Sequence, residues 1–546
     1  MVPNNFRRLR GVAIAAAVVA SLALSSCAAA SGDVSSGPQA EVAPGFLAKA
    51  GGDAENPGKL TVQLDYDTAE VQGLDPQPAE AARSWMIMGL VYETLVTVDE
   101  NFEIQPELAT AWSQPDPTTY VFTLDTDAKF SNGRALTPAD VVGSINRLLK
   151  TPSIWTGQLG PVESVEETAP NEVTVRLASP HAPFLAALAN TPAAILPMAE
   201  IEDGSVDVTK EMLGTGPFVV EEHKQDTKWL FTSNTNWRGG DNFDVKELEL
   251  QIVKQETTRQ ASLREGSAGL TNFVSVDSLT QMQGAAGVSV VNQLQSDYYY
   301  VLLNSQRPGS PLEQQDVRFA INAAIDRQAI ADIVFAGTTS PTGVTPSTLP
   351  GACDPTGLPS ATTDVSKAKS VIEAAELGSE PLKMLVYTDE PVLTQIAQLI
   401  QQQLAEIGVT TEIEQYDGAT YNNRVFTTKP GNFDLAIGWF AGYVDTSSVT
   451  QWWNPSISRF SDGFAGSHDD LNELIAAGAA AQEPSERAEI FTRLCATADE
   501  YSEMVPLVHR PSIIGFNSGS VDPTIQSNEG YGDLLRNITD YRLTGK

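Results

Sequence analysis

Hydrophobic positions in the second half of the chain follow two different periods. Residues 382–387 (LKMLVY) have the pattern of a strand, and residues 391–408 (PVLTQIAQLIQQQLAEIG) that of a helix between Pro391 and Gly408. Proline in the first turn and glycine at the end are typical helix boundaries. Because residues 409–416 (VTTEIEQY) again have the pattern of a strand, this region predicts a βαβ unit, which requires a parallel sheet.

Other segments predict the same fold class. Apolar residues at helical spacing predict a helix over 320–337, and a further helix is expected over 255–266. Strands are predicted over 59–64, 245–253, 409–416 and 434–439. Residues 214–223 and 228–237 are expected to form an antiparallel hairpin. The chain is therefore expected to be an α/β protein with a strand-rich insertion early in its length.

The N-terminus has the pattern of an export signal. Three arginines within residues 1–10 precede an apolar run of 14 residues, which is too short to cross a bilayer comfortably. The sequence Leu24-Ser25-Ser26-Cys27 resembles a bacterial lipobox, in which the cysteine is acylated; an ordinary cleavage site is the alternative. We expect residues 1–26 to be removed and Cys27 to carry fatty acyl chains such as palmitate, which anchor the protein to the outer face of the cytoplasmic membrane. Residues 27–57, rich in Ala, Ser, Gly and Pro, are expected to form a flexible tether.

Composition limits the size of the fold and the partners. The 546 residues are 42% hydrophobic, which is enough for two or three domains. The formal net charge of −35 argues against nucleic acid as a partner. Apart from Cys27, the chain has only Cys353 and Cys495, which could form one disulfide in an oxidising compartment. Sequence alone leaves that pairing open.

The chain lacks recognisable catalytic spacings. Its four histidines are scattered, with neither H-x-x-x-H nor H-E-x-x-H, and no G-x-S-x-G element is present. Acidic residues are so abundant that pairs of them arise by chance. We therefore expect no enzyme activity, no cofactor and no metal site, and a lipid-anchored envelope hydrolase is the alternative of another class.

Six segments together resemble one protein family in the right order: 69–77, 89–99, 106–112, 120–142, 214–218 and 316–330. The chain is similar in them to extracytoplasmic solute-binding proteins, family 5, of peptide- and nickel-type ABC importers. The resemblance runs from about residue 59 to about residue 540 and implies a monomer that delivers a solute to an ABC permease and its ATPase. An oligopeptide is the expected ligand, and a metal chelate, haem or a glycoside is the alternative.

The resemblance also implies a fold. It is the periplasmic-binding-protein-like two-lobed fold (type II, cluster C), with an extra domain inserted in lobe one. The ligand would bind in the cleft between the lobes, at the carboxyl ends of strands, and hinge motion would close the lobes over it. The expected ranges are lobe one at 58–92, 206–297 and 512–546, the extra domain at 93–205, lobe two at 298–511, and crossings near 296–304 and 505–511.

The segment IGWFAGYVDTSS (437–448) carries the most informative departure from the family. The family's peptide binders have Trp, two residues and then Asp here; the Trp lines a pocket and the Asp pairs with the peptide's ammonium. This chain matches at Trp439 but has Gly442 in place of the Asp, with Tyr443 and Asp445 following. Since a buried ammonium without a charge partner is costly, either Asp445 or another acid takes this role, or the ligand has no free amine.

Further candidates follow from the same resemblance. The segment Glu80-Ala81-Ala82 stands where the family pairs the ligand's backbone with an extended strand. Tyr300 or Tyr298 is expected to face the cleft, with core packing as the alternative. Arg424 and Arg459 are the basic residues best placed to bind a carboxylate through a bidentate fork, or else they are ordinary solvated arginines.

Overall fold

The computed structural model describes residues 54–68, 73–79, 82–99, 102–293, 296–375, 377–440, 444–458, 460–524 and 534–544. The expected signal, Cys27 and almost all of the tether lie outside these ranges. Within them, no helix has both the length and the apolar composition that a membrane span requires.

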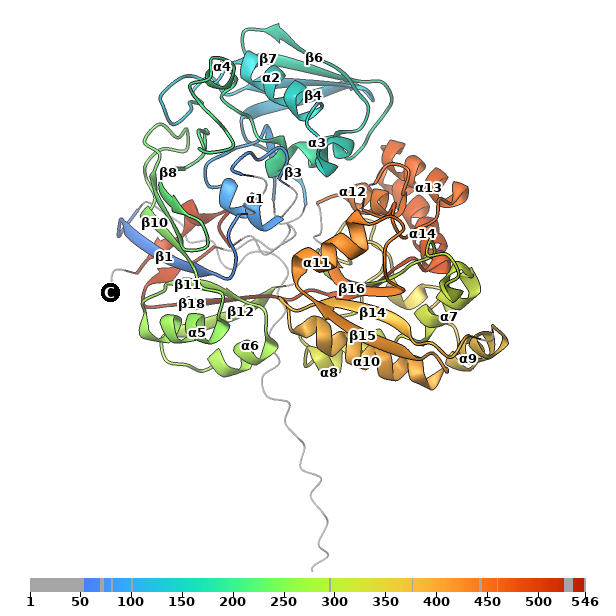
Figure 1. Ribbon diagram of the computed structural model, residues 1–546. Helices are drawn as coiled ribbons and strands as arrows, with labels where there is room; N and C mark the ends of the chain where they lie inside the picture. Colours follow the sequence, from blue (N-terminus) through green and yellow to red (C-terminus); the bar gives the residue numbers. More distant parts are fainter. Residues whose placement is uncertain are drawn as a thin grey trace, which may run out of the picture. The chain divides into compact units, whose positions relative to one another are not determined.

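A seven-stranded mixed sheet contains the first expected strand at its centre. Its order is β12-β18-β11-β1-β10-β9-β8 (Figure 1). Strand β1 pairs in parallel with β10 and β11, whereas β8 and β9 form the expected antiparallel hairpin. The strands are β1 (Gly58–Leu64), β8 (Phe218–Lys224), β9 (Lys228–Ser233), β10 (Val245–Ile252), β11 (Leu270–Phe273), β12 (Val288–Gln293) and β18 (Ser512–Asn517). Helices α5 (Glu256–Glu265) and α6 (Val276–Met282) pack against this sheet.

The predicted βαβ unit is confirmed in a second sheet of five strands. Its order is β15-β14-β16-β13-β17, and β14 is parallel to both β15 and β16. The strands are β13 (Tyr298–Leu303), β14 (Leu382–Tyr387), β15 (Thr411–Tyr416), β16 (Leu435–Phe440) and β17 (Met504–His509). Helix α10 (Val392–Glu406) connects β14 to β15 and buries Leu393, Ile396, Ile400 and Leu404, which lie three or four residues apart and therefore on one face.

The prediction of a single helix over 320–337 is wrong in one respect, because the structure has two helices there. α7 (Gln315–Ala324) ends at Ile325, and α8 (Arg327–Val334) starts directly afterwards. The Asp326 side chain accepts a hydrogen bond of 2.9 Å from the backbone N–H of Ala329. Aspartate is a strong N-cap residue, so it starts a new helix although the apolar spacing continues through the break.

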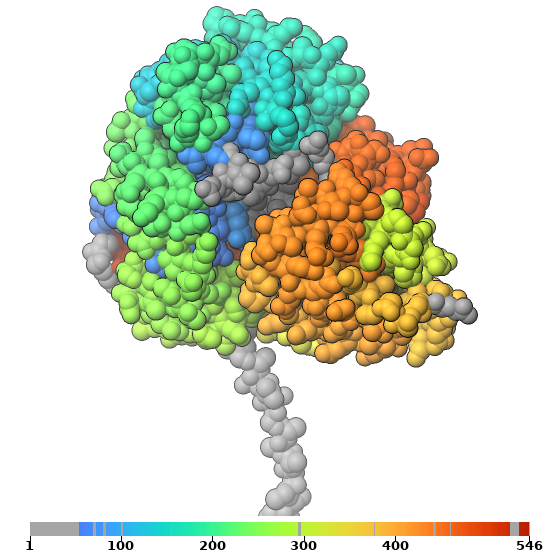
Figure 2. All heavy atoms as spheres, in the orientation of Figure 1, coloured from blue at the N-terminus to red at the C-terminus, as the bar shows by residue number. Residues whose placement is uncertain are grey.

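The strand-rich insertion is confirmed as a four-stranded antiparallel sheet in the order β4-β5-β7-β6, drawn at the top of Figure 1 with α2 and α3. Its elements are β4 (Ala109–Asp116), β5 (Thr119–Leu124), α2 (Pro138–Leu148), β6 (Val162–Ala169), β7 (Glu172–Leu177), α3 (Phe184–Leu188) and α4 (Met198–Glu202). On the face drawn in Figure 2, the atoms of this insertion, of the first sheet's region (green) and of the second sheet's region (orange) form three groups.

The remaining elements are four short strands and several helices from different parts of the chain. They are α1 (Ala82–Met88), β2 (Val96–Val98), β3 (Ile104–Pro106), α9 (Val365–Ala374), α11 (Gly418–Asn422), α12 (Thr446–Thr450), α13 (Asp469–Ala480), α14 (Pro484–Tyr501), β19 (Val521–Asp522) and β20 (Arg542–Leu543). Cys353 and Cys495 are bonded as a disulfide, with their Cα atoms 6.0 Å apart. The sequence alone had left this pairing open.

The chain passes between the two large sheets twice. It goes from β12 to β13, and it returns from β17 to β18. The backbone N–H of Arg510 donates a hydrogen bond of 2.9 Å to the carbonyl oxygen of Asp297, so the two passages lie side by side. The exact limits of the lobes and of the extra domain stay a prediction.

Candidate ligand-binding site

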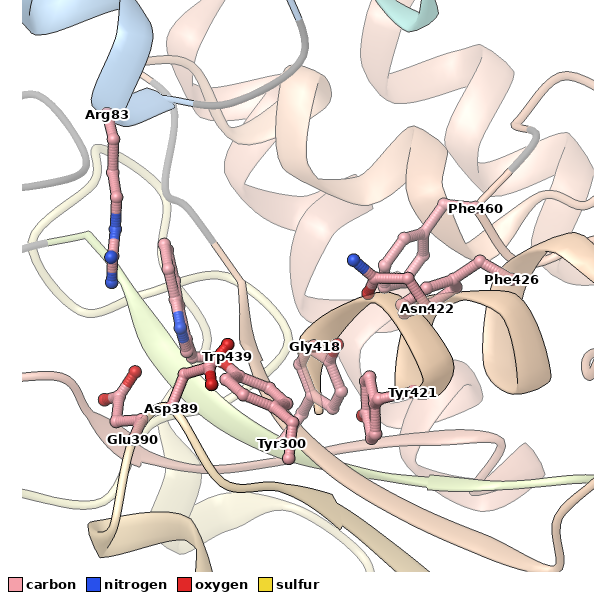
Figure 3. Close-up of a pocket in the computed structure, with 11 residues that line it drawn as sticks. Arg83, Tyr300, Asp389, Glu390, Gly418, Tyr421, Asn422, Phe426, Trp439 and Phe460 are labelled. Atoms are coloured by element: carbon pink, nitrogen blue, oxygen red, sulfur yellow. The ribbon is translucent and has the colours of Figure 1, made fainter. Parts of the chain in front are cut away.

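A pocket of about 350 Å³ lies where the two sheet regions meet. Strands β14 and β16 run parallel, so their carboxyl ends reach the same edge of the second sheet. Open α/β sheets bind ligands at this edge. Eleven of the described residues line the pocket: Arg83, Tyr300, Tyr387, Asp389, Glu390, Gly418, Tyr421, Asn422, Phe426, Trp439 and Phe460 (Figure 3). Arg83 comes from α1, far from the others in the sequence.

Aromatic rings form most of the wall. Tyr298 and Tyr300 are two residues apart on β13 and so point to the same face. Only Tyr300 lines the pocket, whereas Tyr298 is fully buried and packs on Phe440. The residue opposite Tyr300 on β16 is Gly438, where a Cβ atom would lie only 2.7 Å from the Tyr300 hydroxyl oxygen. Burial raises the pKa of Tyr300, which keeps its phenol neutral. Of the two expected tyrosines, the pocket therefore uses Tyr300.

Trp439 lines the pocket, as the family pattern led us to expect, and two guanidinium groups lie against it. The Arg510 Cζ atom is 4.5 Å from the centre of the indole ring and the Arg83 Cζ atom 5.8 Å from it. Cations in such positions are attracted by the ring's electrons. Burial opposes ionisation of Asp65, but Arg83, Arg259, Arg510 and a hydrogen bond from Asn272 outweigh it and lower the pKa of that carboxyl. The basic side of the site thus has its own counter-charge.

The acidic side of the pocket comes from the turn after β14. Glu390 is only 3% exposed. Its Oε1 atom accepts hydrogen bonds of 2.7 Å from the Tyr299 hydroxyl and 3.1 Å from Arg510 Nε. Its Oε2 atom accepts none from any residue that the structure describes. Asp389 is exposed in the pocket, close to Gly418, where a Cβ atom would lie 2.8 Å from its Oδ2.

Two expected residues have other partners and do not line this pocket. Asp445 accepts a hydrogen bond of 2.7 Å from the backbone N–H of Ser447, which caps α12, and one of 2.9 Å from Arg487 Nη2. Arg424 lies over the ring of Tyr416, its Cζ 4.2 Å from the ring centre, and 3.7 Å from Glu414. Both side chains are held in local structure, so neither is assigned to the ligand.

Several other expected residues cannot be placed. Glu80, Ala81, Gly442, Tyr443 and Arg459 lie outside the described residues, and of Ala82 only the backbone is described, as the first residue of α1.

Sequence reasoning missed Arg83, Asp389, Glu390 and Arg510. A signal existed for the acidic pair, because Thr388-Asp389-Glu390-Pro391 stands between a predicted strand and a predicted helix, where ligand-binding loops occur. No comparable signal marked Arg83 or Arg510. Among the residues with described positions, no three or more His, Cys, Asp or Glu side chains are grouped so that they could hold a metal ion.

Comparisons with known proteins give the family and the fold of the chain. A probable D,D-dipeptide-binding periplasmic protein of Escherichia coli (strain K12) is 28% identical over 405 residues, covering 70% of this chain and 76% of that protein. A haem-binding protein A of Haemophilus influenzae is 27% identical over 481 residues, covering 81% of this chain and 85% of that protein. The structure of a periplasmic binding protein, DppA, from Helicobacter pylori in complex with the peptide STSA has a TM-score of 0.77 at 21% identity and covers 89% of this chain and 98% of that one.

The last likeness shows the fold, the expected two-lobed α/β fold of periplasmic binding proteins. The model of one family, bacterial extracellular solute-binding proteins, family 5 Middle, matches residues 103–458. The match covers more than half of the chain, and the chain therefore belongs to the family 5 bacterial extracellular solute-binding proteins.

Proposed function

We propose that this protein is the substrate-binding subunit of an ABC importer, which captures an oligopeptide between its two lobes and delivers it to a membrane permease. Family membership supports the capture of a solute. The names of the compared proteins support two classes of ligand, peptides and haem. The Escherichia coli relative is named as a D,D-dipeptide-binding protein, and the Haemophilus influenzae relative is named as a haem-binding protein.

The observation that supports a peptide as the ligand is the presence of both acidic and basic side chains in one aromatic pocket. Asp389 and Glu390 lie on one side, and Arg83 projects into the same pocket (Figure 3). A peptide presents an ammonium, a carboxylate and apolar side chains, and each of these finds a complementary surface here. Haem presents two carboxylates and a large apolar ring, so it gives the acidic pair no role.

The site of action follows from the N-terminus. Cleavage before Cys27 and acylation of its sulfur would hold the protein at the outer face of the cytoplasmic membrane, near its permease and ATPase subunits. A tether over 27–57 would let the binding region reach the permease. We propose a monomer without cofactor or catalytic centre.

Native mass spectrometry of residues 28–546 after mild purification tests the ligand class. The expected result is a series of added masses that fragment into amino-acid residues. A single bound mass that is not a peptide would overturn the proposal of a peptide ligand and favour haem, a metal chelate or a glycoside. Steady hydrolysis of chromogenic peptide or ester substrates would instead indicate an envelope hydrolase.

A further inference from the structure

Glu390 has an unusual combination of burial and hydrogen bonding. Its side chain is 3% exposed, yet it lines the pocket. A carboxylate can accept about four hydrogen bonds, and Oε1 accepts the two that come from Tyr299 and Arg510. Oε2 accepts none within the described part of the chain. Leaving a buried charged acceptor unpaired is costly, so this oxygen marks a place prepared for a donor from the ligand.

The position of Glu390 is held from three sides. Tyr299 belongs to β13, Arg510 to the passage between the sheets, and Glu390 itself stands at the N-terminal end of α10. A helix of 15 residues offers the positive end of its dipole to that carboxylate. The side chain is therefore fixed before the ligand arrives, which favours binding because less freedom is lost.

Charge around the turn favours a cation as the missing donor. Arg510 is within 3.1 Å of Glu390 and offsets its charge. Asp389 adds a second carboxylate that lines the same pocket. Within the turn itself, the two carboxylates of Asp389 and Glu390 are paired with one guanidinium group, that of Arg510. The turn therefore keeps a net negative charge, which one ammonium group would neutralise.

We propose that Glu390, assisted by Asp389, binds the ammonium group at the N-terminus of the peptide ligand, in place of the carboxylate that this chain lacks at Gly442. The inference rests on the proposed function, because it assumes a peptide ligand. Ammonium supplies three donors, enough to reach Oε2 of Glu390 and the carboxylate of Asp389. Asp445 is not assigned this role, because it does not line the pocket and Arg487 already pairs with both of its oxygens.

The test compares two probes that differ only in the amino group. One is a library of tetrapeptides Ala-X-Ala-Ala, in which X is each amino acid except cysteine. The other is the same library with the first residue replaced by propionyl, which is alanine without its amino group. Competition between the libraries is measured by native mass spectrometry on residues 28–546 of the wild type, Glu390→Gln, Asp389→Asn and, as a matched control, Glu414→Gln. Glu414 lies in the same region but pairs with Lys383 and Tyr416 outside the pocket.

We expect the wild type and Glu414→Gln to prefer the free amine by about 10- to 100-fold, as for a hydrogen bond between charged groups. Glu390→Gln should lose most of this preference, and Asp389→Asn should lose a smaller part. An unchanged preference in Glu390→Gln overturns the assignment of Glu390 and leaves peptide binding in place. If the wild type binds neither library, the peptide function itself fails, and this inference with it. Thermal unfolding checks each variant; should Glu390→Gln not fold, an unchanged preference in the exposed Asp389→Asn overturns the inference.

Discussion

Trp439 contributes to ligand binding through the face of its ring. It is partly buried, lines the pocket, and lies within 6 Å of two guanidinium groups, at 4.5 and 5.8 Å. Aromatic residues in desolvated pockets dominate many binding energies. We expect Trp439→Ala to weaken ligand binding by about 1–3 kcal/mol while the protein stays folded, as measured by isothermal titration and circular dichroism.

A second tryptophan provides the matched control. Trp112 is also partly buried but belongs to β4 of the insertion. Trp112→Ala should leave affinity unchanged. Equal losses of affinity in both variants would mean that the effect is a general loss of structure and not the removal of a pocket wall.

Asp445 illustrates how a residue in a plausible position can serve the fold instead. Its carboxylate caps α12 and pairs with Arg487 at 2.9 Å. We expect Asp445→Ala to lower the free energy of unfolding by about 1–2 kcal/mol, since an N-cap alone is worth about 1 kcal/mol. Asp445→Asn should keep the cap and cost less. Urea denaturation measures both, and a loss of the preference for free-amine peptides in Asp445→Asn would return this residue to the binding site.

The sequence identified some site residues because the family pattern marks them locally. Trp439 follows a strand at a recognisable position, and Tyr300 lies on a strand whose alternation allowed either face. Glu390 was missed because its importance depends on Tyr299 and Arg510, which are 91 and 120 residues away. A one-dimensional pattern does not show which acidic residue, in a chain of net charge −35, loses its water on folding.

At the scale of elements, predictions succeeded where local rules and packing agree. The βαβ unit over 382–416 has proline at its helix start, glycine at its helix end, and one continuous apolar face. The helix over 320–337 failed because Asp326 caps a new helix without disturbing the apolar spacing. The hairpin strand expected from residue 214 starts only at Phe218, because Gly214 and Gly216 pack against another segment.

That packing explains the glycines of the motif GTGPF. The backbone N–H of Gly216 donates a hydrogen bond of 2.8 Å to the carbonyl oxygen of Val91, and a Cβ atom at Gly216 would lie 2.7 Å from the same oxygen. Backbone atoms cannot move aside as a flexible side chain can. We expect Gly216→Ala to lower the free energy of unfolding by about 1–3 kcal/mol, the usual cost of overpacking.

A glycine of the insertion, Gly157, tests this explanation. A Cβ atom at Gly157 would meet no atom within 4 Å, so Gly157→Ala should leave stability nearly unchanged in the same urea titration. If Gly216→Ala left the free energy of unfolding unchanged, the close approach to Val91 would not be needed for the fold.

At the scale of the whole molecule, the site joins segments that are distant in the sequence. Arg83 precedes the first passage between the sheets, Glu390 and Trp439 lie between the two passages in the sequence, and Arg510 belongs to the second passage. The family resemblance predicted a site between the lobes, because the topology of the fold determines where the cleft lies. The side chains that meet there depend on how the two regions pack, which local patterns do not encode.

Glu93 is a second buried carboxylate that joins distant segments, at the junction with the insertion. It is 6% exposed, accepts a hydrogen bond of 3.2 Å from Trp237 Nε1, and lies 3.1 Å from Arg238. Burial, followed by the nearby charge of Glu107, raises the pKa of Glu93 from 4.5 to about 7, although Arg238 acts in the opposite direction. The folded protein therefore holds this proton more tightly than the unfolded chain does.

This difference predicts how stability depends on pH. Below pH 4.5 both states are protonated and the contribution of Glu93 is fully present; as pH rises from 4.5 to about 7, only the unfolded chain releases the proton, so the contribution is lost. We expect the free energy of unfolding of wild type, relative to Glu93→Gln, to fall by about 2–3 kcal/mol between pH 4.5 and pH 7.5. Urea titrations of both proteins at the two pH values measure this change, and taking the difference cancels the constant cost of the substitution and the titration of groups that do not interact with Glu93. A difference that is the same at both pH values would mean that Glu93 is already ionised in the folded state, with Arg238 overcoming its burial.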